Sequence, residues 1–212
     1  SALAYRAMAA EPVTTTFPYT VFRDLAAYGE HSMNRHRARD TRQALERYEY
    51  RMLEDPDLLH AQGWSVMRDA YAFRGTRPPV DEATYRRQLT AVFEGKPPMI
   101  VVALSDGQLA GYLTSYATGS EATVEKLYIS PSFRDDRVGL GLYWVTLTGW
   151  ASAPGVRNAW AGGTMPGGVD RFKMSIGAVL EQVPVHAGMR RAIRLGYRVL
   201  KPDALSLKDL HA

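Results

Sequence analysis

The sequence contains no cysteine and only five histidines among 212 residues. Without cysteine the chain has no thiol nucleophile, no disulfide and no zinc site built on thiolates. The histidines are scattered, with neither an HExxH nor an HxH spacing, so a histidine metal site would have to be assembled from distant segments. The sequence therefore predicts chemistry that uses no metal.

Long apolar runs are also absent. No stretch approaches the roughly 20 apolar residues of a membrane-spanning helix. Residues 1–10 have neither the basic start nor the apolar core of a secretory signal. We see no internal repeat and no low-complexity segment, and we expect a soluble, cytoplasmic protein.

The composition that is present is ordinary for a globular protein, with 46% hydrophobic and 23% charged residues. A chain of this length makes one medium domain, or one domain with an appendage. The 26 Lys and Arg against 22 Asp and Glu give a formal net charge of +4. This charge favours anionic partners such as nucleotide phosphates, nucleic acid or acidic polymers, without choosing among them.

The N-terminal part of the chain predicts an extended segment followed by helices. Residues 12–23 carry Thr, Phe, Tyr and Val between two prolines, which indicates an edge strand. Pro56 disfavours helix for the residue before it and so separates two helical patterns. Helices are expected over residues 24–54, 58–73 and 81–93.

From Met99 onward the pattern changes to strands. The apolar run MIVVAL, an Asp-Gly turn at 106–107 and the alternating run QLAGYLTSYA predict a β-hairpin. A strand is expected at 122–130 and a helix at 138–153. The remaining expected elements are a strand at 156–161, a helix at 169–176, a strand at 178–185 and a basic helix after 188.

A strand, a polar turn and a glycine-containing helix start follow one another within residues 124–141. Pro131 ends the strand, and Gly139 and Gly141 allow a close approach to the backbone at the start of the helix. The exposed amides and the dipole at such a helix start favour an anion.

This order of elements resembles the GNAT superfamily of N-acyltransferases, whose motif is R/Q-x-x-G-x-G/A. The motif stands here within residues 134–141 as RDDRVGLG. Arg134, Gly139 and Gly141 match it, whereas Arg137 replaces its first glycine. Acyl-CoA binding at this loop is what the resemblance implies.

The resemblance covers about residues 96–185, because FKMSIGAVLEQVPV at 172–185 is similar to the helix-Gly-strand ending of the family. It implies that the pyrophosphate of CoA binds the amides of 135–141 and that the pantetheine arm pairs along the strand at 127–129. The implied cofactor-binding residues are Leu127, Tyr128, Ile129, Arg134, Asp135, Asp136, Arg137, Val138, Gly139, Leu140 and Gly141.

The resemblance also implies an α/β fold with a central mixed β-sheet flanked by helices, preceded by a helical N-terminal extension. Residues 1–95 would be part of the same domain or packed on it, and residues 96–212 would form the acyl-CoA-binding core and a C-terminal tail. The expected reaction transfers an acyl group from acetyl-CoA or another acyl-CoA to a small-molecule or peptide amine, without a metal.

The best candidate for a catalytic base is Glu125, which follows Val124 on a strand expected to be central. The resemblance places it where several acyltransferases keep a carboxylate that takes the proton of the amine through water. A buried carboxylate can have a raised pKa and act as a base near neutral pH. The alternative is an ion pair of Glu125 with Lys126 or with an arginine.

Two further side chains are catalytic candidates. Lys173 stands where the family often has a tyrosine that acts as general acid, and it would bind an anionic substrate or an acyl oxygen, or simply be solvated. Tyr128 would border the acceptor cleft and donate a proton, or it would pack on the sheet as an ordinary aromatic residue.

Asp135 and Asp136 depart from the expected pattern for a loop that faces a pyrophosphate. Their charges would repel the phosphates. Alternatively they stabilise the helix dipole, with Arg134 and Arg137 supplying the compensating positive charge. A degenerate module that binds a ligand without turnover is therefore a second hypothesis.

The basic helix pattern within 24–54 supports a third hypothesis. It carries Arg35, Arg39 and Arg42 at helical spacings and is similar to the basic helix of FemAB-like aminoacyl transferases, which share the GNAT fold and use aminoacyl-tRNA. Binding of tRNA would follow from this interpretation. A solvated helix stabilised by ion pairs is the alternative.

Overall fold

The computed structural model describes residues 4–8, 15–95, 98–134, 137–163 and 168–189. Its strands are β1 (Ala4–Met8), β2 (Thr15–Phe22), β3 (Glu49–Met52), β4 (Met99–Ser105), β5 (Gln108–Thr118), β6 (Glu121–Ile129), β7 (Asn158–Gly163) and β8 (Val179–Met189). They form one 8-stranded sheet in the order β1-β8-β2-β7-β6-β5-β4-β3. The pair β6–β7 is parallel and the other neighbouring pairs are antiparallel, so the sheet is mixed as predicted.

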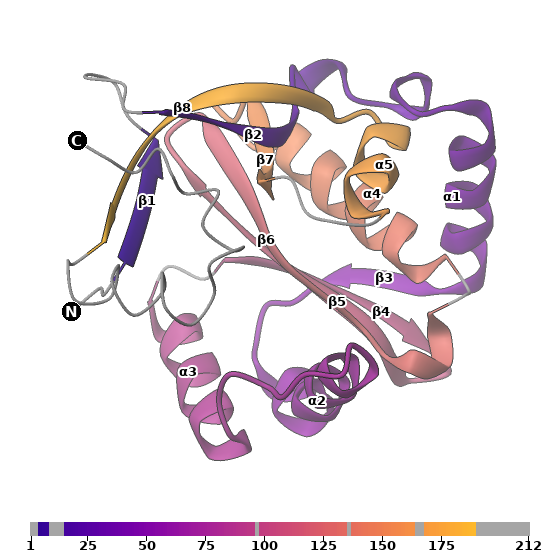
Figure 1. Cartoon of the computed structure of the whole chain (residues 1–212). Coiled ribbons are helices and arrows are strands. Elements are labelled where there is room, and N and C mark those ends of the chain that lie inside the picture. The colour runs from indigo at the N-terminus through magenta and orange to yellow at the C-terminus, as the bar shows by residue number, and fades with distance from the viewer. Residues whose placement is uncertain (1–3, 9–14, 96–97, 135–136, 164–167, 190–212) are drawn as a thin grey trace.

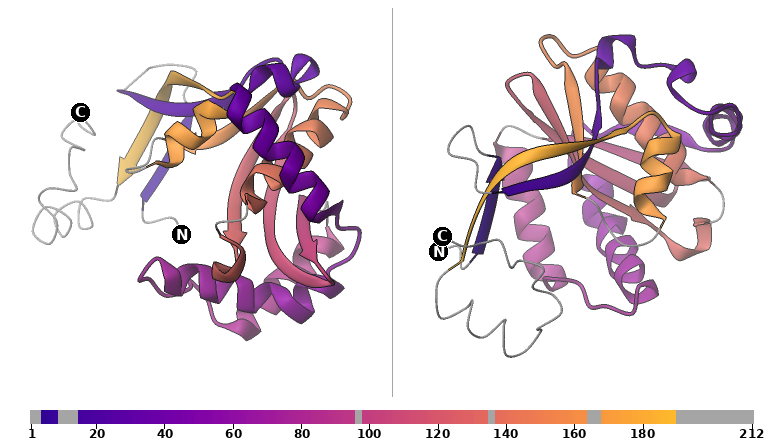
Figure 2. Two further views of the ribbon diagram at one scale, coloured as in Figure 1. Left: turned by 90° about the vertical axis from the view of Figure 1, so that its right-hand side faces the viewer. Right: turned by 45° about the horizontal axis from the view of Figure 1, so that its top comes forward.

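Helices cover both faces of this sheet (Figures 1 and 2). The helices of eight or more residues are α1 (Arg35–Arg47), α2 (Trp64–Phe73), α3 (Glu82–Glu94) and α4 (Val138–Ala151). The shorter ones are the 3-10 turns η1 (Leu25–Ala27), η2 (Glu30–Ser32) and η4 (Pro131–Phe133), the π-helical turn η3 (Leu59–Gly63) and α5 (Val169–Ser175).

The apolar run of β4 shows why both faces need cover. Val101 and Ala103 belong to the hydrophobic cluster that contains residues of α1 and α4. Ile100, Val102 and Leu104 belong to the cluster that contains residues of η3, α2 and α3. A continuous apolar strand of this kind is stable only when it is buried from both sides, and β4 therefore lies in the middle layer of the molecule.

The helices predicted at 58–73, 81–93, 138–153 and 169–176, the hairpin and the later strands are confirmed, with small shifts of their ends. Two expectations are wrong. The single helix over 24–54 is instead α1 followed by β3, because the backbone is extended at Tyr48, with φ −123° and ψ 144°. The predicted edge strand is β2, which lies inside the sheet between β7 and β8. The N-terminal part, expected as an extended segment and helices, contributes three strands to the sheet that also contains the strands after residue 98.

A β-bulge interrupts β6. Thr114 of β5 pairs with Lys126, but the next residue, Ser115, pairs with Val124, so Glu125 is the extra residue of β6. The bulge changes which side chains face which helix layer: Val124 and Leu127 both pack in the cluster under α4, although three positions separate them.

No helix within the described ranges is long and apolar enough to cross a membrane. Likewise, the described part of the chain holds no group of three or more His, Asp or Glu side chains arranged to bind a metal ion. The basic helix expected after 188 lies outside the described residues beyond Met189.

Candidate functional site

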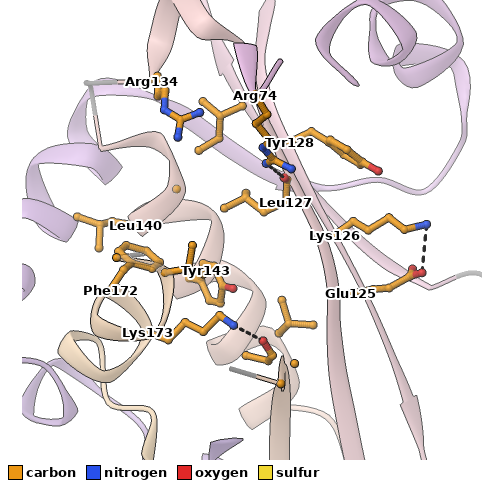
Figure 3. Close-up of a pocket in the computed structure, with 18 of the residues that line it drawn as sticks. Arg74, Glu125, Lys126, Leu127, Tyr128, Arg134, Leu140, Tyr143, Phe172 and Lys173 are labelled. Carbon is orange, nitrogen blue, oxygen red and sulfur yellow. Dashed lines mark hydrogen bonds and ion pairs between the residues drawn. The ribbon is translucent and has the colours of Figure 1, made fainter. Parts of the chain in front are cut away.

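A cavity of about 1080 Å³ opens where β6 and β7 part. The two strands pair from Glu121–Asn158 to Thr123–Trp160, and the described residues contain no further pair between them. Beyond that point residues 124–129 of β6 line one side of the cavity and residues 161–163 of β7 line another. The other lining residues come from β2, α1, α2, α4 and α5 and the loops beside them: Phe17, Arg37, Tyr71, Arg74, Arg134, Arg137, Gly139, Leu140, Tyr143, Gly168, Val169, Phe172 and Lys173 (Figure 3).

Helix α4 begins at this cavity. Its N-cap residue, Arg137, has a left-handed backbone with φ 64° and ψ 12° and makes no side-chain cap. Glycine adopts this conformation at no steric cost, which explains physically why the family motif has glycine at this position. Arg137 stands at that position here and adopts the left-handed conformation itself.

The two glycines of the motif have different surroundings. Gly139 lines the cavity, and a Cβ there would lie 3.2 Å from Cδ1 of Ile129. Gly141 is buried, and a Cβ there would lie 2.1 Å from Cζ of Tyr50. Val138 is likewise fully buried. Of the implied cofactor-binding residues in this helix start, Gly139 and Leu140 line the cavity, whereas Val138 and Gly141 pack in the core.

Three arginines lie near the start of α4. Arg37 of α1 donates from Nε to Oγ of Ser175 at 3.2 Å. The guanidinium of Arg134 stacks 4.3 Å from the ring centroid of Phe73, and Nε of Arg137 lies 3.2 Å from a carboxylate oxygen of Asp40. Each side chain has a partner that holds it at the cavity and leaves guanidinium donors available for an anion. Asp135 and Asp136 lie outside the described residues.

Cationic side chains also bind the two parted strands. Nη2 of Arg74 donates to the carbonyl oxygen of Leu127 in β6 at 3.5 Å. Nζ of Lys173 donates to the carbonyl oxygen of Ala161 in β7 at 2.5 Å (Figure 3). Where the two strands no longer pair, each of these side chains donates a hydrogen bond to a backbone carbonyl at the cavity.

Lys173 itself is buried, with 4% of its surface exposed. Burial lowers the pKa of its ammonium group, and the carboxylate of Asp170, 3.9 Å away, opposes this shift. The alternative that Lys173 is simply solvated is therefore excluded.

Glu125 lines the cavity with an exposed side chain. One carboxylate oxygen lies 3.2 Å from Nζ of Lys126, and the other accepts a hydrogen bond of 3.5 Å from Thr114. The expected burial of this carboxylate is wrong, because the bulge turns Glu125 outward from the sheet. The ion pair with Lys126, which the sequence left as an alternative, is present.

Tyr128 lies on the opposite face of β6 from Leu127 and is buried in the cluster formed with η3, α2 and α3. Burial raises the pKa of its hydroxyl, and the neighbouring Tyr71 hydroxyl and the Glu125 carboxylate raise this pKa further. Its ring packs against that of Tyr112, with centroids 5.0 Å apart. Glu125 and Tyr128 both line the cavity, and Figure 3 shows both side chains on the side of β6 away from Tyr143 and Lys173.

No protein-family model matches the sequence, and no curated protein matches it significantly. The structure is similar to that of FemX, with a TM-score of 0.65 and 11% identity over 93% of this chain and 68% of that chain. A second similar structure is the C-terminal domain (DUF2156) of a candidate lysylphosphatidylglycerol synthetase from Agrobacterium fabrum, with a TM-score of 0.62 and 13% identity over 96% of this chain and 67% of that chain. A third is L-PGS from Bacillus licheniformis, with a TM-score of 0.57 and 13% identity over 98% of this chain and 69% of that chain.

The chain has the GNAT-type fold. The predicted resemblance and fold class are therefore confirmed. At identities this low the likeness concerns the fold and not the activity.

Several cavity residues of this GNAT-type fold were not singled out from the sequence. The sequence gives no local reason to prefer Arg37 to Arg35, Arg39 and Arg42, which are exposed on α1, whereas Arg37 lines the cavity. Arg74 and Tyr71 gave no signal, because nothing local connects the end of α2 to β6. Tyr143 packs in the core and lines the cavity as well.

Proposed function

We propose that this chain is an acyltransferase that moves an acyl group from an acyl-CoA to an amine. The observation that carries the proposal is the parting of β6 and β7 at the start of α4, which leaves a cavity beside a strand edge and a helix N-terminus. A strand edge binds an extended chain through backbone hydrogen bonds, and a helix N-terminus favours phosphate. An acyl-CoA has both parts: an extended pantetheine arm and a pyrophosphate.

The residues present suit these two parts. Arg37, Arg134 and Arg137 would hold the pyrophosphate beside Gly139, where the absence of a side chain leaves room. The arm would pair along residues 127–129 of β6. Arg74 holds the Leu127 carbonyl there through a long hydrogen bond of 3.5 Å, which is weak enough for an amide to replace it.

The acyl-CoA supplies an activated thioester, and the side chains of this protein do the rest. Glu125 takes the proton of the attacking amine directly or through water. Its exposed carboxylate, held by Lys126, suits an acceptor that enters from solvent. Backbone N–H groups along 127–129 stabilise the negative charge that develops on the carbonyl oxygen.

A second candidate is FemAB-like transfer of an aminoacyl group from tRNA. It is favoured by the likeness over 93% of the chain to FemX and over 96% to a candidate synthetase of lysylphosphatidylglycerol, an aminoacylated lipid. Arg35, Arg39 and Arg42 are exposed on α1 and would contact the tRNA backbone. Their ion pairs, such as Arg42 with Glu30 at 3.5 Å, suit the alternative of a solvated helix.

Binding and transfer experiments separate these candidates. Thermal shifts are measured with acetyl-CoA and longer acyl-CoAs, and turnover is followed as thiol release with a panel of amines. In parallel, tRNA binding is measured by fluorescence anisotropy at low and moderate salt, for the wild type and for a variant with Gln at Arg35, Arg39 and Arg42. We expect a thermal shift and thiol release with an acyl-CoA.

Submicromolar tRNA binding that weakens steeply with salt and is lost in the triple variant would favour the second candidate. Binding of an acyl-CoA without turnover of any amine would favour a degenerate, non-catalytic module. No thermal shift at millimolar acyl-CoA would overturn the acyl-CoA proposal.

A further inference from the structure

Most buried tyrosine hydroxyls in the described part of the chain have hydrogen-bond partners. Those of Tyr28 and Tyr50 donate to backbone carbonyls, and those of Tyr85 and Tyr112 share a hydrogen bond of 3.4 Å. The hydroxyl of Tyr143 differs, because among the described residues it has no hydrogen-bond partner. A hydroxyl that faces a cavity without a protein partner is available to water or to a ligand there.

The surroundings of Tyr143 indicate what its hydroxyl can bind. Only 5% of the residue is exposed, and its ring packs against those of Phe22 and Phe172, with centroid distances of 6.3 and 5.5 Å. The residue nevertheless lines the cavity (Figure 3). A buried ring fixed by two aromatic neighbours holds its hydroxyl in one place, where water or a ligand inside the cavity can accept its hydrogen bond.

The other side-chain donors near this place have partners. The ammonium of Lys173 donates to Ala161 and lies beside Asp170. The hydroxyl of Tyr128 lies on the opposite face of the sheet, where Tyr71 interacts with it. Of the cavity-lining hydroxyls on the α4 side within the described ranges, Tyr143 supplies the donor that no protein group uses.

We infer that Tyr143 donates a hydrogen bond to the carbonyl oxygen of the acyl group during transfer. This inference rests on the proposed function. When the amine attacks, the C–N bond forms and negative charge develops on that oxygen; the C–S bond then breaks, the thiolate leaves, and the amine proton passes to Glu125 or water. Tyr143 keeps its proton throughout, so it acts as an electrostatic stabiliser rather than as a general acid.

The ionisation of Tyr143 agrees with this role. Burial raises the pKa of its hydroxyl, so the group stays protonated and available as a donor at neutral and mildly alkaline pH. Its position on α4, one turn after Gly139, places it on the helix that we propose to hold the pyrophosphate. One helix would thus orient both the phosphate and the reacting carbonyl.

The test is Tyr143→Phe, with Tyr28→Phe as a matched control. Both tyrosines pack against Phe22, but Tyr28 does not line the cavity and donates to the carbonyl of Ile176. We expect Tyr143→Phe to lower kcat by about 10²–10³, as removal of one such donor does in other enzymes, with an unchanged KM for the acyl-CoA. Its melting temperature should not fall, because no hydrogen bond within the described protein is lost.

Tyr28→Phe should give the opposite result, a lower melting temperature with an unchanged kcat. Tyr128→Phe should lower kcat less than Tyr143→Phe does. An active wild type whose kcat survives Tyr143→Phe would overturn the role of Tyr143 alone. A wild type that binds acyl-CoA but acylates no amine would overturn the proposed function and the role of Tyr143 together.

Discussion

Gly141 of α4 lies directly against the ring of Tyr50 in β3. A Cβ at position 141 would lie 2.1 Å from Cζ of that ring, which is closer than non-bonded atoms approach each other in proteins. The hydroxyl of Tyr50 donates to the carbonyl of Val138 at 3.3 Å, which holds the ring beside the helix. This glycine of the motif therefore serves the packing of helix on sheet.

Gly141→Ala should destabilise the protein by about 1–3 kcal/mol, because an added methyl group in a packed core forces its neighbours to move. The matched control is Gly139→Ala, whose Cβ would meet only the ends of two flexible side chains, Ile129 at 3.2 Å and Leu127 at 3.7 Å. Urea denaturation of both variants measures the difference. Equal stabilities of the two variants would contradict the packing role of Gly141.

Gly139→Val should leave the fold intact and abolish the thermal shift caused by acyl-CoA. The branched side chain would project into the cavity beside Leu127 and Ile129, where we propose that the cofactor lies. Differential scanning fluorimetry with and without acetyl-CoA checks this. A thermal shift equal to that of the wild type would show that the cofactor does not bind at the start of α4.

Arg137→Gly and Arg137→Ala separate backbone strain from side-chain charge. Both variants lose the ion pair with Asp40, which is partly exposed and worth little. Only glycine relieves the left-handed backbone at φ 64°, so Arg137→Gly should be more stable than Arg137→Ala by about 1 kcal/mol. Both should bind acyl-CoA more weakly, with a smaller dependence on salt. An alanine variant as stable as the glycine variant would show that the backbone at 137 is not strained.

Glu125→Gln should lower turnover at neutral pH by a factor of about 10²–10⁴, the usual contribution of a positioned proton acceptor, with the affinity for acyl-CoA nearly unchanged. Lys126→Gln is the comparison, because it breaks the same ion pair and keeps the carboxylate. If turnover falls by the same factor in both variants, the ion pair accounts for the loss and the role of Glu125 as a base is contradicted.

Stability should fall as the pH rises above 10. Burial raises the pKa values of Tyr28, Tyr50, Tyr128 and Tyr143 in the folded protein above the ordinary 10.0. Between the two values the unfolded chain has released protons that the folded chain retains, so the stabilisation present below pH 10 is lost as the pH increases. Chemical denaturation from pH 8 to 11 should show this slope, and Tyr143→Phe should make it shallower. An identical slope for this variant would contradict the burial of the hydroxyl.

The sequence by itself determined the elements that depend on neighbouring residues. The hairpin follows from apolar runs on either side of Asp106-Gly107, where both turn residues have positive φ. Helix α3 begins where Asp81 caps it, accepting a hydrogen bond of 2.7 Å from the backbone of Thr84. The order of strand, loop and glycine-containing helix start likewise carried the resemblance that implied the fold class.

The tertiary structure alone decided which residues meet in the cavity. Arg74 binds a carbonyl 53 residues away, and β2 lies between β7 and β8, strands from the far end of the chain. The bulge that turns Glu125 outward depends on the register of β6 against β5, and the free hydroxyl of Tyr143 depends on what surrounds it in space. Periodicity and turn residues report interactions over a few positions, whereas strand register and the convergence of distant side chains are set by the packing of the whole sheet and its helices.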